Sequence, residues 1–143
     1  MRGRKSYKRF LDMGVVIFLF AGTGMGVAAA TAVRTVIPST IQSPVPVFQC
    51  DQNHNCVALP IALGVDTPIY VSLFGSGIRN AGSVSVTIGN TPVQPAYAGP
   101  QGQYPGLDQV NFPLPLTLRG GGLVNVIVTA DGVVSNAVQL NIQ

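Results

Sequence analysis

The side chains best suited to chemistry stand close together: Cys50, His54 and Cys56 lie in one short polar stretch. Two chemistries fit them. The three could ligate a metal, but their spacing matches no structural zinc pattern and the fourth ligand would have to come from elsewhere. Alternatively, Cys50 and Cys56 form a disulfide across a hairpin, with His54 in its solvated loop. The second interpretation is favoured, so we predict a Cys50–Cys56 disulfide, no metal and no cofactor.

The remaining acid–base groups are scattered, which argues against an enzyme. His54 is the only histidine and the chain contains no glutamate. Beyond position 30 the carboxylates stand singly in four turn-like contexts (Asp51, Asp66, Asp108 and Asp131). Hydrolysis by paired carboxylates needs two of them close together, and a calcium loop needs several. We therefore predict no catalytic residue. Asp108 is assigned a structural role, because at a strand entrance its oxygens can accept backbone N–H bonds.

Aromatic residues supply a second kind of candidate site. A platform for carbohydrate could be formed by five of them: Tyr70, Phe74, Tyr97, Tyr104 and Phe112. The alternative is that these residues belong to the core and rim of a β-sandwich, and the absence of tryptophan favours that interpretation. Carbohydrate binding is kept as the alternative function.

The charge distribution excludes nucleic acid as a partner. The formal net charge of +3 comes from the first nine residues, where five of the eight basic residues stand. Beyond position 30 there are three arginines, no lysine and four aspartates, which leaves a nearly neutral body. A protein that neutralises phosphates needs clustered lysine and arginine.

The N-terminal segment predicts export. Basic residues precede an uncharged apolar run over residues 13–33, which ends in small residues, as in a secretory signal. Cleavage after Ala30 or Ala32 would fit the A-x-A pattern. The run is also long enough to remain as a membrane-spanning helix, with the body outside the inner membrane. Residues 1–32 are thus a signal peptide or an anchor, and either places the body in an oxidising compartment that favours the disulfide.

Residues 33–46 contain three prolines and predict a linker or an edge strand. From there to the end, apolar and polar residues alternate as in half-buried strands. We expect seven or eight of them: 45–49, 57–63, 69–74, 84–88, 93–97, 109–112, 124–130 and 134–142. Gly75 and Gly77 close one strand, and Asp131-Gly132 predicts a two-residue hairpin turn. Residues 47–143 are therefore predicted to be one antiparallel β-sandwich domain.

Four motifs of this body carry a resemblance to a known family: LFGSGIRN (residues 73–80), VTIGNTPV (86–93), YAGPQGQYPGLDQVNFPLP (97–115) and VTADGVVSNAVQLNIQ (128–143). Over residues 46–143 the chain resembles the Solibacter-type C-terminal domain, an uncharacterised module of secreted acidobacterial proteins and a relative of the IPT/TIG group. The resemblance implies an immunoglobulin-like fold and an exported protein, and places Asp108 in the family's most recognisable motif. It implies no activity.

These observations together predict a non-catalytic interaction or structural module of the cell surface or periplasm. Its expected partner is a protein or a second copy of the chain, assembled through sheet-edge pairing by the arm over residues 33–46. A carbohydrate-binding accessory domain is the alternative. Contact with a membrane is expected only through the N-terminal segment, if it is not cleaved.

Overall fold

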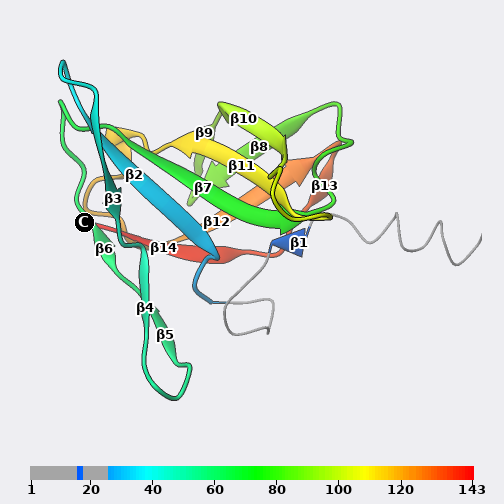
Figure 1. Ribbon diagram of the computed structural model, residues 1–143, viewed down its shortest axis with the longest axis horizontal. Helices are drawn as coiled ribbons and strands as arrows, with labels where there is room; N and C mark the ends of the chain where they lie inside the picture. Colours follow the sequence, from blue (N-terminus) through cyan, green and yellow to red (C-terminus); the bar gives the residue numbers. More distant parts are fainter. Residues whose placement is uncertain (1–15, 18–25) are drawn as a thin grey trace, which may run out of the picture.

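The computed structural model describes residues 16–17 and 26–143, and the regular secondary structure in these ranges is almost entirely β-strand (Figure 1). Two sheets pack face to face. Sheet 1 has the order β10-β11-β7-β2-β3, with β1 paired to the end of β7, and sheet 2 has the order β6-β14-β12-β8-β9, with β13 paired to β12. The predicted all-β sandwich is therefore confirmed at the level of two packed, largely antiparallel sheets.

The strands of sheet 1 are β1 (Val16–Ile17), β2 (Ala30–Val36), β3 (Ile41–Val45), β7 (Ile69–Ser76), β10 (Tyr97–Pro100) and β11 (Asp108–Pro113). Those of sheet 2 are β6 (Pro60–Ile61), β8 (Val84–Ile88), β9 (Thr91–Val93), β12 (Gly122–Ala130), β13 (Val133–Val134) and β14 (Val138–Ile142). A separate hairpin is formed by β4 (Phe48–Cys50) and β5 (Cys56–Ala58), and one 3-10 turn spans Leu116–Leu118. Figure 1 shows this hairpin projecting from the sandwich.

Alternation along the central strands builds the core. In β7 and β11 every second side chain is buried, and β12 and β14 supply the matching apolar face from sheet 2. Phe112 is the largest side chain that is completely buried. Because successive side chains of a strand point to opposite faces, the residues between the buried ones form the two outer faces of the sandwich.

Several strand boundaries differ from the sequence-based expectation. The run 93–97 is not one strand: β9 ends at Val93 in sheet 2, and β10 begins at Tyr97 in sheet 1. Pro95 lies between them, where the chain crosses from one sheet to the other. The run 134–142 is interrupted at Ser135, whose buried hydroxyl accepts a hydrogen bond from the Val128 amide at 2.9 Å. This inward turn of the chain separates β13 from β14.

The segment 33–46 is part of sheet 1. Its first residues complete β2, which lies between β7 and β3, and its last residues form β3 at the edge. Ala30 and Ala32, the predicted cleavage positions, are buried residues of β2. Of the helix predicted over residues 13–33, residues 16–17 and 27–33 are extended or in strands, and the remainder lies outside the described residues. Within the described ranges 16–17 and 26–143, no helix is long and apolar enough to cross a membrane.

Candidate functional site

The first candidate site is the disulfide hairpin, where Cys50, His54 and Cys56 lie close together in the sequence. Cys50 and Cys56 are directly opposite each other in β4 and β5 and form the predicted disulfide. The Asp51 carboxylate accepts hydrogen bonds from the Asn53 and Asn55 amides at 2.8 and 2.9 Å, and from the Asn55 side chain. These bonds stabilise the ionised form, so the pKa of the Asp51 carboxyl lies below its usual value. The Asp51 carboxylate thus stabilises the conformation of the loop through these hydrogen bonds.

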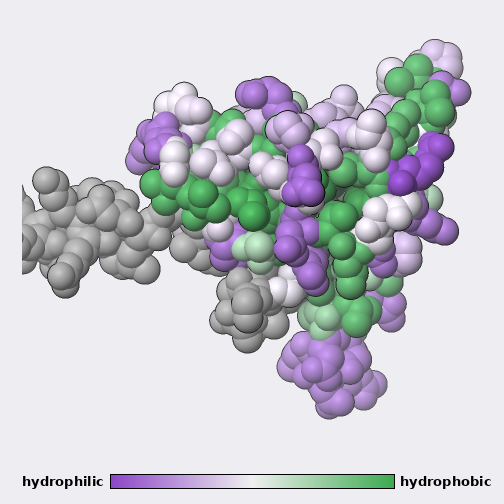
Figure 2. Space-filling view, turned by 180° about the vertical axis from the view of Figure 1, so that it is seen from behind, coloured by the Kyte–Doolittle hydropathy of each residue, from purple (hydrophilic) through white to green (hydrophobic). Residues whose placement is uncertain are grey.

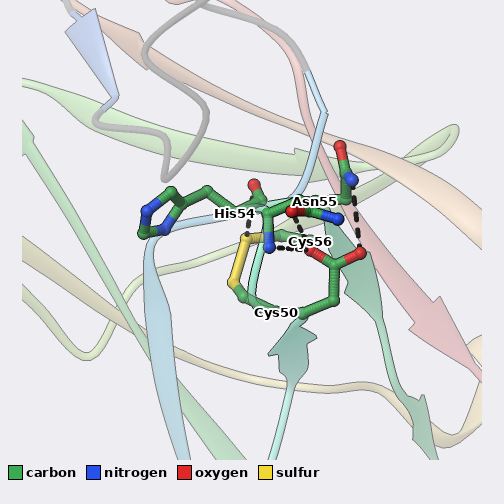
Figure 3. The surroundings of a disulfide bond; sticks show 6 residues. Cys50, His54, Asn55 and Cys56 are labelled. Carbon is green, nitrogen blue, oxygen red and sulfur yellow. Dashed lines mark hydrogen bonds between the residues drawn. A yellow bond between two sulfur atoms is a disulfide. The ribbon is translucent and has the colours of Figure 1, made fainter.

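The backbone of His54 belongs to this loop, since its amide donates to the Asp51 carbonyl at 3.1 Å, but its imidazole does not bond to the Asp51 carboxylate. Figure 3 shows its imidazole extending to the opposite side of the loop from Asn55. Figure 2 shows that the end of the hairpin is hydrophilic and projects into solvent. No group of three His, Cys, Asp or Glu side chains that could hold a metal ion occurs in the part of the chain that the structure describes. The hairpin is therefore a stabilised polar loop.

Two of the other aspartates bind backbone amides of distant turns. Asp108 is 1% exposed, and its carboxylate accepts hydrogen bonds from the Ile78 and Arg79 amides at 2.8 and 3.0 Å. It also forms an ion pair with the Arg79 side chain, with 2.6 Å between Nε and Oδ1. Gly77, which precedes these amides, has a φ of 83°. Asp108 therefore fastens the turn after β7 to the start of β11.

Asp131 has a similar role in sheet 2, where it follows β12 and binds the backbone just before β8. Its carboxylate accepts hydrogen bonds from the Gly82 and Ser83 amides at 3.1 and 2.8 Å. Asp131 and Gly132 have φ values of 49° and 80°, and they connect paired residues of β12 and β13. A turn with two positive φ angles favours Asp-Gly. Both carboxylates thus hold backbone amides that are distant in the sequence.

A shallow groove of about 320 Å³ lies between the base of the hairpin and sheet 2. Its walls carry the apolar Val57 and Leu123 and the amides Gln139 and Asn141. None of the residues lining it is an acid, a base or a free thiol. The groove therefore contains apolar and amide side chains but no titratable or nucleophilic group.

The edge strand β3 of sheet 1 carries a proline that faces outward. The Thr35 amide donates to the Pro68 carbonyl, on the β7 side of β2. Along a strand, the backbone N–H and C=O groups of successive residues point to opposite sides. The backbone groups of Arg34 therefore point toward β3, where its partner is Ser43. The next residue, Pro44, therefore points outward and has no N–H to offer.

The other edge strands of the two sheets also contain a proline. The Gln101 amide donates toward β11, so its neighbour Pro100 faces away from the sheet. The Gly89 amide donates toward β12, which by the same alternation leaves Pro92 facing outward on β9. The short edge strand β6 contains Pro60. Prolines on edge strands are a known protection against pairing with another chain. The sheet-edge assembly expected from the sequence stays a prediction.

The outer face of sheet 1 gathers aromatic side chains. Tyr70 and Tyr97 are 41% and 43% exposed, and Phe74 is half-buried on the same face. Tyr70 and Phe74 belong to β7, in which Val71 and Leu73 are buried on the opposite face, and Tyr97 belongs to β10. Of the five candidate platform residues, these three share one face. Phe112 is instead buried in the core, and Tyr104 lies in the loop between β10 and β11.

Amide and hydroxyl side chains lie between the aromatic ones. Gln109 and Asn111 of β11 alternate with buried Val110 and Phe112, which places both on the outer face. The Gln109 side-chain amide donates to the Asn111 side-chain oxygen at 2.7 Å and lies 3.5 Å from the Ser72 hydroxyl. Neither amide was among the candidate residues predicted from the sequence. The alternation of apolar and polar residues over 108–113 was the signal that could have revealed them.

Tyr97 is held in place by its own strand. Its hydroxyl donates a short hydrogen bond to the Pro100 carbonyl. A Cβ atom at Gly99 would lie only 2.9 Å from that hydroxyl oxygen and 3.2 Å from the ring carbon that bears it. Only glycine therefore leaves room for the phenol ring to lie along β10 and over the sheet. The hydroxyl bond therefore restrains the orientation of the ring.

Comparison of this chain with protein-family models, with curated proteins and with solved structures gave no match.

Proposed function

We propose that this protein is a non-catalytic, exported interaction module that binds its partner with the outer face of sheet 1. The observation that carries the proposal is the group of aromatic and amide side chains on that face. The dispersed aspartates, each bonded to backbone amides or standing alone, support a module without catalysis. The N-terminal basic and apolar segment and the disulfide support an extracellular, cell-surface or periplasmic location.

The fold of the module is proposed to be immunoglobulin-like. The order β2-β7-β11-β10 in sheet 1 matches the A-B-E-D sheet of such sandwiches, and β14-β12-β8-β9 in sheet 2 matches the order G-F-C-C′. This correspondence, together with the resemblance of residues 46–143 to the Solibacter-type and IPT/TIG-like domains, supports the assignment. The β2–β3 hairpin is an addition at the edge of the first sheet.

A carbohydrate-binding accessory domain is the second candidate function. It is favoured by Tyr70, Phe74 and Tyr97 on one sheet face, since exposed aromatic side chains concentrate binding energy at surfaces. Pairing through a sheet edge is the less favoured route of interaction because outward-facing prolines stand on the edge strands.

Site-specific photo-crosslinking in the exporting cell tests the location of the binding surface. A photoreactive p-benzoylphenylalanine is placed at Ser72 on the outer face of sheet 1, or at Thr87 on the outer face of sheet 2. Both residues are half-buried in the middle of a strand, which makes them a matched pair. Adducts are expected from position 72 and not from position 87. Equal yields, or none from position 72, would contradict the proposed surface.

A further inference from the structure

We infer that the outer face of sheet 1 is a binding site for a neutral polysaccharide chain, with Tyr97 and Tyr70 as its stacking positions and Gln109 and Asn111 as its hydrogen-bonding groups. This inference rests on the proposed function and assigns the chemical class of the ligand.

The absence of charged side chains on the outer face of sheet 1 argues against charged ligands. The outward positions of the four strands β2, β7, β11 and β10 carry no charged side chain; they are Thr31, Val33, Thr35, Tyr70, Ser72, Phe74, Ser76, Tyr97, Gly99, Gln109, Asn111 and Pro113. Recognition of phosphate, sulfate or an acidic chain needs arginine or lysine. A face made of aromatic rings, amides and hydroxyls offers apolar area and neutral donors and acceptors. That is the complement of an uncharged sugar, which has C–H groups on its faces and hydroxyls around its rim.

The arrangement of the rings fits an extended chain of sugars. Tyr97 is opposite Asn111, which is opposite Ser72, and Tyr70 lies two residues further along β7. With strands about 4.8 Å apart and a rise of about 3.4 Å per residue, the Cα atoms of Tyr97 and Tyr70 are about 12 Å apart. A single sugar ring cannot contact both. The ligand must therefore be an oligomer or polymer that crosses the strands.

Preorganisation separates this face from an ordinary sheet surface. The Tyr97 ring is fixed over Gly99 by its hydroxyl bond to Pro100, so it loses little side-chain freedom when a ligand binds. The amide of Gln109 is oriented by Asn111. The outer face of sheet 2 provides a contrast within the same molecule. There Gln139 donates to Asn125 at 3.4 Å in a similar amide pair, but no aromatic residue lies on its strands.

The test is a titration of the full-length protein with cellohexaose and xylohexaose, with polygalacturonate as the anionic comparison. Because the chain has no tryptophan and two of its four tyrosines lie on this face, binding should change the intrinsic tyrosine fluorescence. Binding to at least one neutral hexasaccharide is expected. Its affinity should be unchanged by added salt, because no charge pair contributes. Stronger binding to polygalacturonate, or an affinity that falls steeply with salt, would overturn the inference.

Substitutions on each sheet test whether the glycan binds the outer face of sheet 1. Tyr70→Ala and Tyr97→Ala should each weaken binding about tenfold or more, the effect of truncating a dominant aromatic contact. Tyr97→Phe keeps the stacking ring but loses the hydroxyl bond to Pro100, so its affinity should lie between those of the unchanged protein and Tyr97→Ala. Gln109→Ala should weaken binding, whereas Gln139→Ala, the matched amide on sheet 2, should not. Equal effects of the two glutamine variants, or no effect of either tyrosine truncation, would refute the site.

The two experiments distinguish a wrong ligand class from a wrong binding face. If no neutral glycan binds while Ser72 still crosslinks to a protein in cells, the ligand class is wrong and the binding face stands. If neither experiment gives a signal, the proposed function fails with it.

Discussion

Replacement of Asp108 by alanine should destabilise the domain more than replacement of its ion-pair partner Arg79. The substitution removes the acceptor of two backbone amides and one guanidinium N–H. Ile78 is buried, so its amide would be left without water or a protein acceptor, at a cost of about 1–3 kcal/mol. With the lost charged hydrogen bonds, the total is about 3–5 kcal/mol, the range for removing one partner of a buried ion pair.

Comparison with neighbouring variants shows which interaction matters. Arg79→Ala should cost only about 1 kcal/mol, because the Arg79 side chain is 35% exposed and Asp108 would keep both backbone donors. Asp108→Asn should fall between the two, since one side-chain oxygen remains as an acceptor. Asp66→Ala, an acidic residue in an exposed turn, is the control and should change stability by no more than about 0.5 kcal/mol.

Urea unfolding followed by circular dichroism measures these free energies, and the melting temperature should fall by about 10–20 °C for Asp108→Ala. An equal cost for Arg79→Ala and Asp108→Ala would mean that the ion pair, and not the capping of backbone amides, holds the turn after β7. That result would refute the reasoning. A loss below about 1 kcal/mol for Asp108→Ala would do so as well.

Three further outcomes are expected. A chain that begins at Val33 should lose the cooperative unfolding shown by one that begins at Gly26, because it lacks the buried start of β2; equal stability in urea would contradict this. The pKa of the Asp51 carboxyl, followed by NMR, should lie below the usual value for aspartate. The hydrogen bonds of the ionised carboxylate therefore stabilise the loop at pH values above the usual pKa, and this stabilisation is lost as the pH falls through the lowered pKa. A pKa at or above the usual value would contradict the loop hydrogen bonds. Pro44→Thr should increase self-association in light scattering because it adds an outward N–H to β3, and a strictly monomeric variant would show that the edge is protected in another way.

The regular alternation of apolar and polar residues made much of the fold predictable. Strands around 69–74, 84–88, 109–112 and 124–130 appear in the structure with small shifts of their ends. The hairpin turn at Asp131-Gly132 and the pairing of Cys50 with Cys56 follow from local chemistry, since each depends on residues that are near in sequence. Strand pairing across the two sheets does not, because it depends on contacts between distant segments.

The candidate site was only partly predictable for the same reason. An aromatic residue in a strand gives no direct sign of which face it occupies. Phe112 and Phe74 both stand in alternating runs, yet one is buried in the core and the other lies on the outer face. Counting from the buried residues of the same strand resolves the difference, but only when the strand boundaries are known. Gly99 could not be recognised at all, since its role is to make room for the ring of Tyr97.

The N-terminal alanines show how one pattern can satisfy two physical demands. Small residues at alternate positions suit a signal peptidase, and they also suit a strand that passes from one sheet to the other through a crowded core. Ala28 is hydrogen-bonded to Gln139 of sheet 2, and the Ala29 carbonyl accepts from Phe74 of sheet 1. Ala28, Ala30 and Ala32 are all buried. A side chain larger than a methyl group would have to displace neighbours there. Cleavage after Ala30 or Ala32, which stays a prediction, would remove buried alanines of this segment from the core.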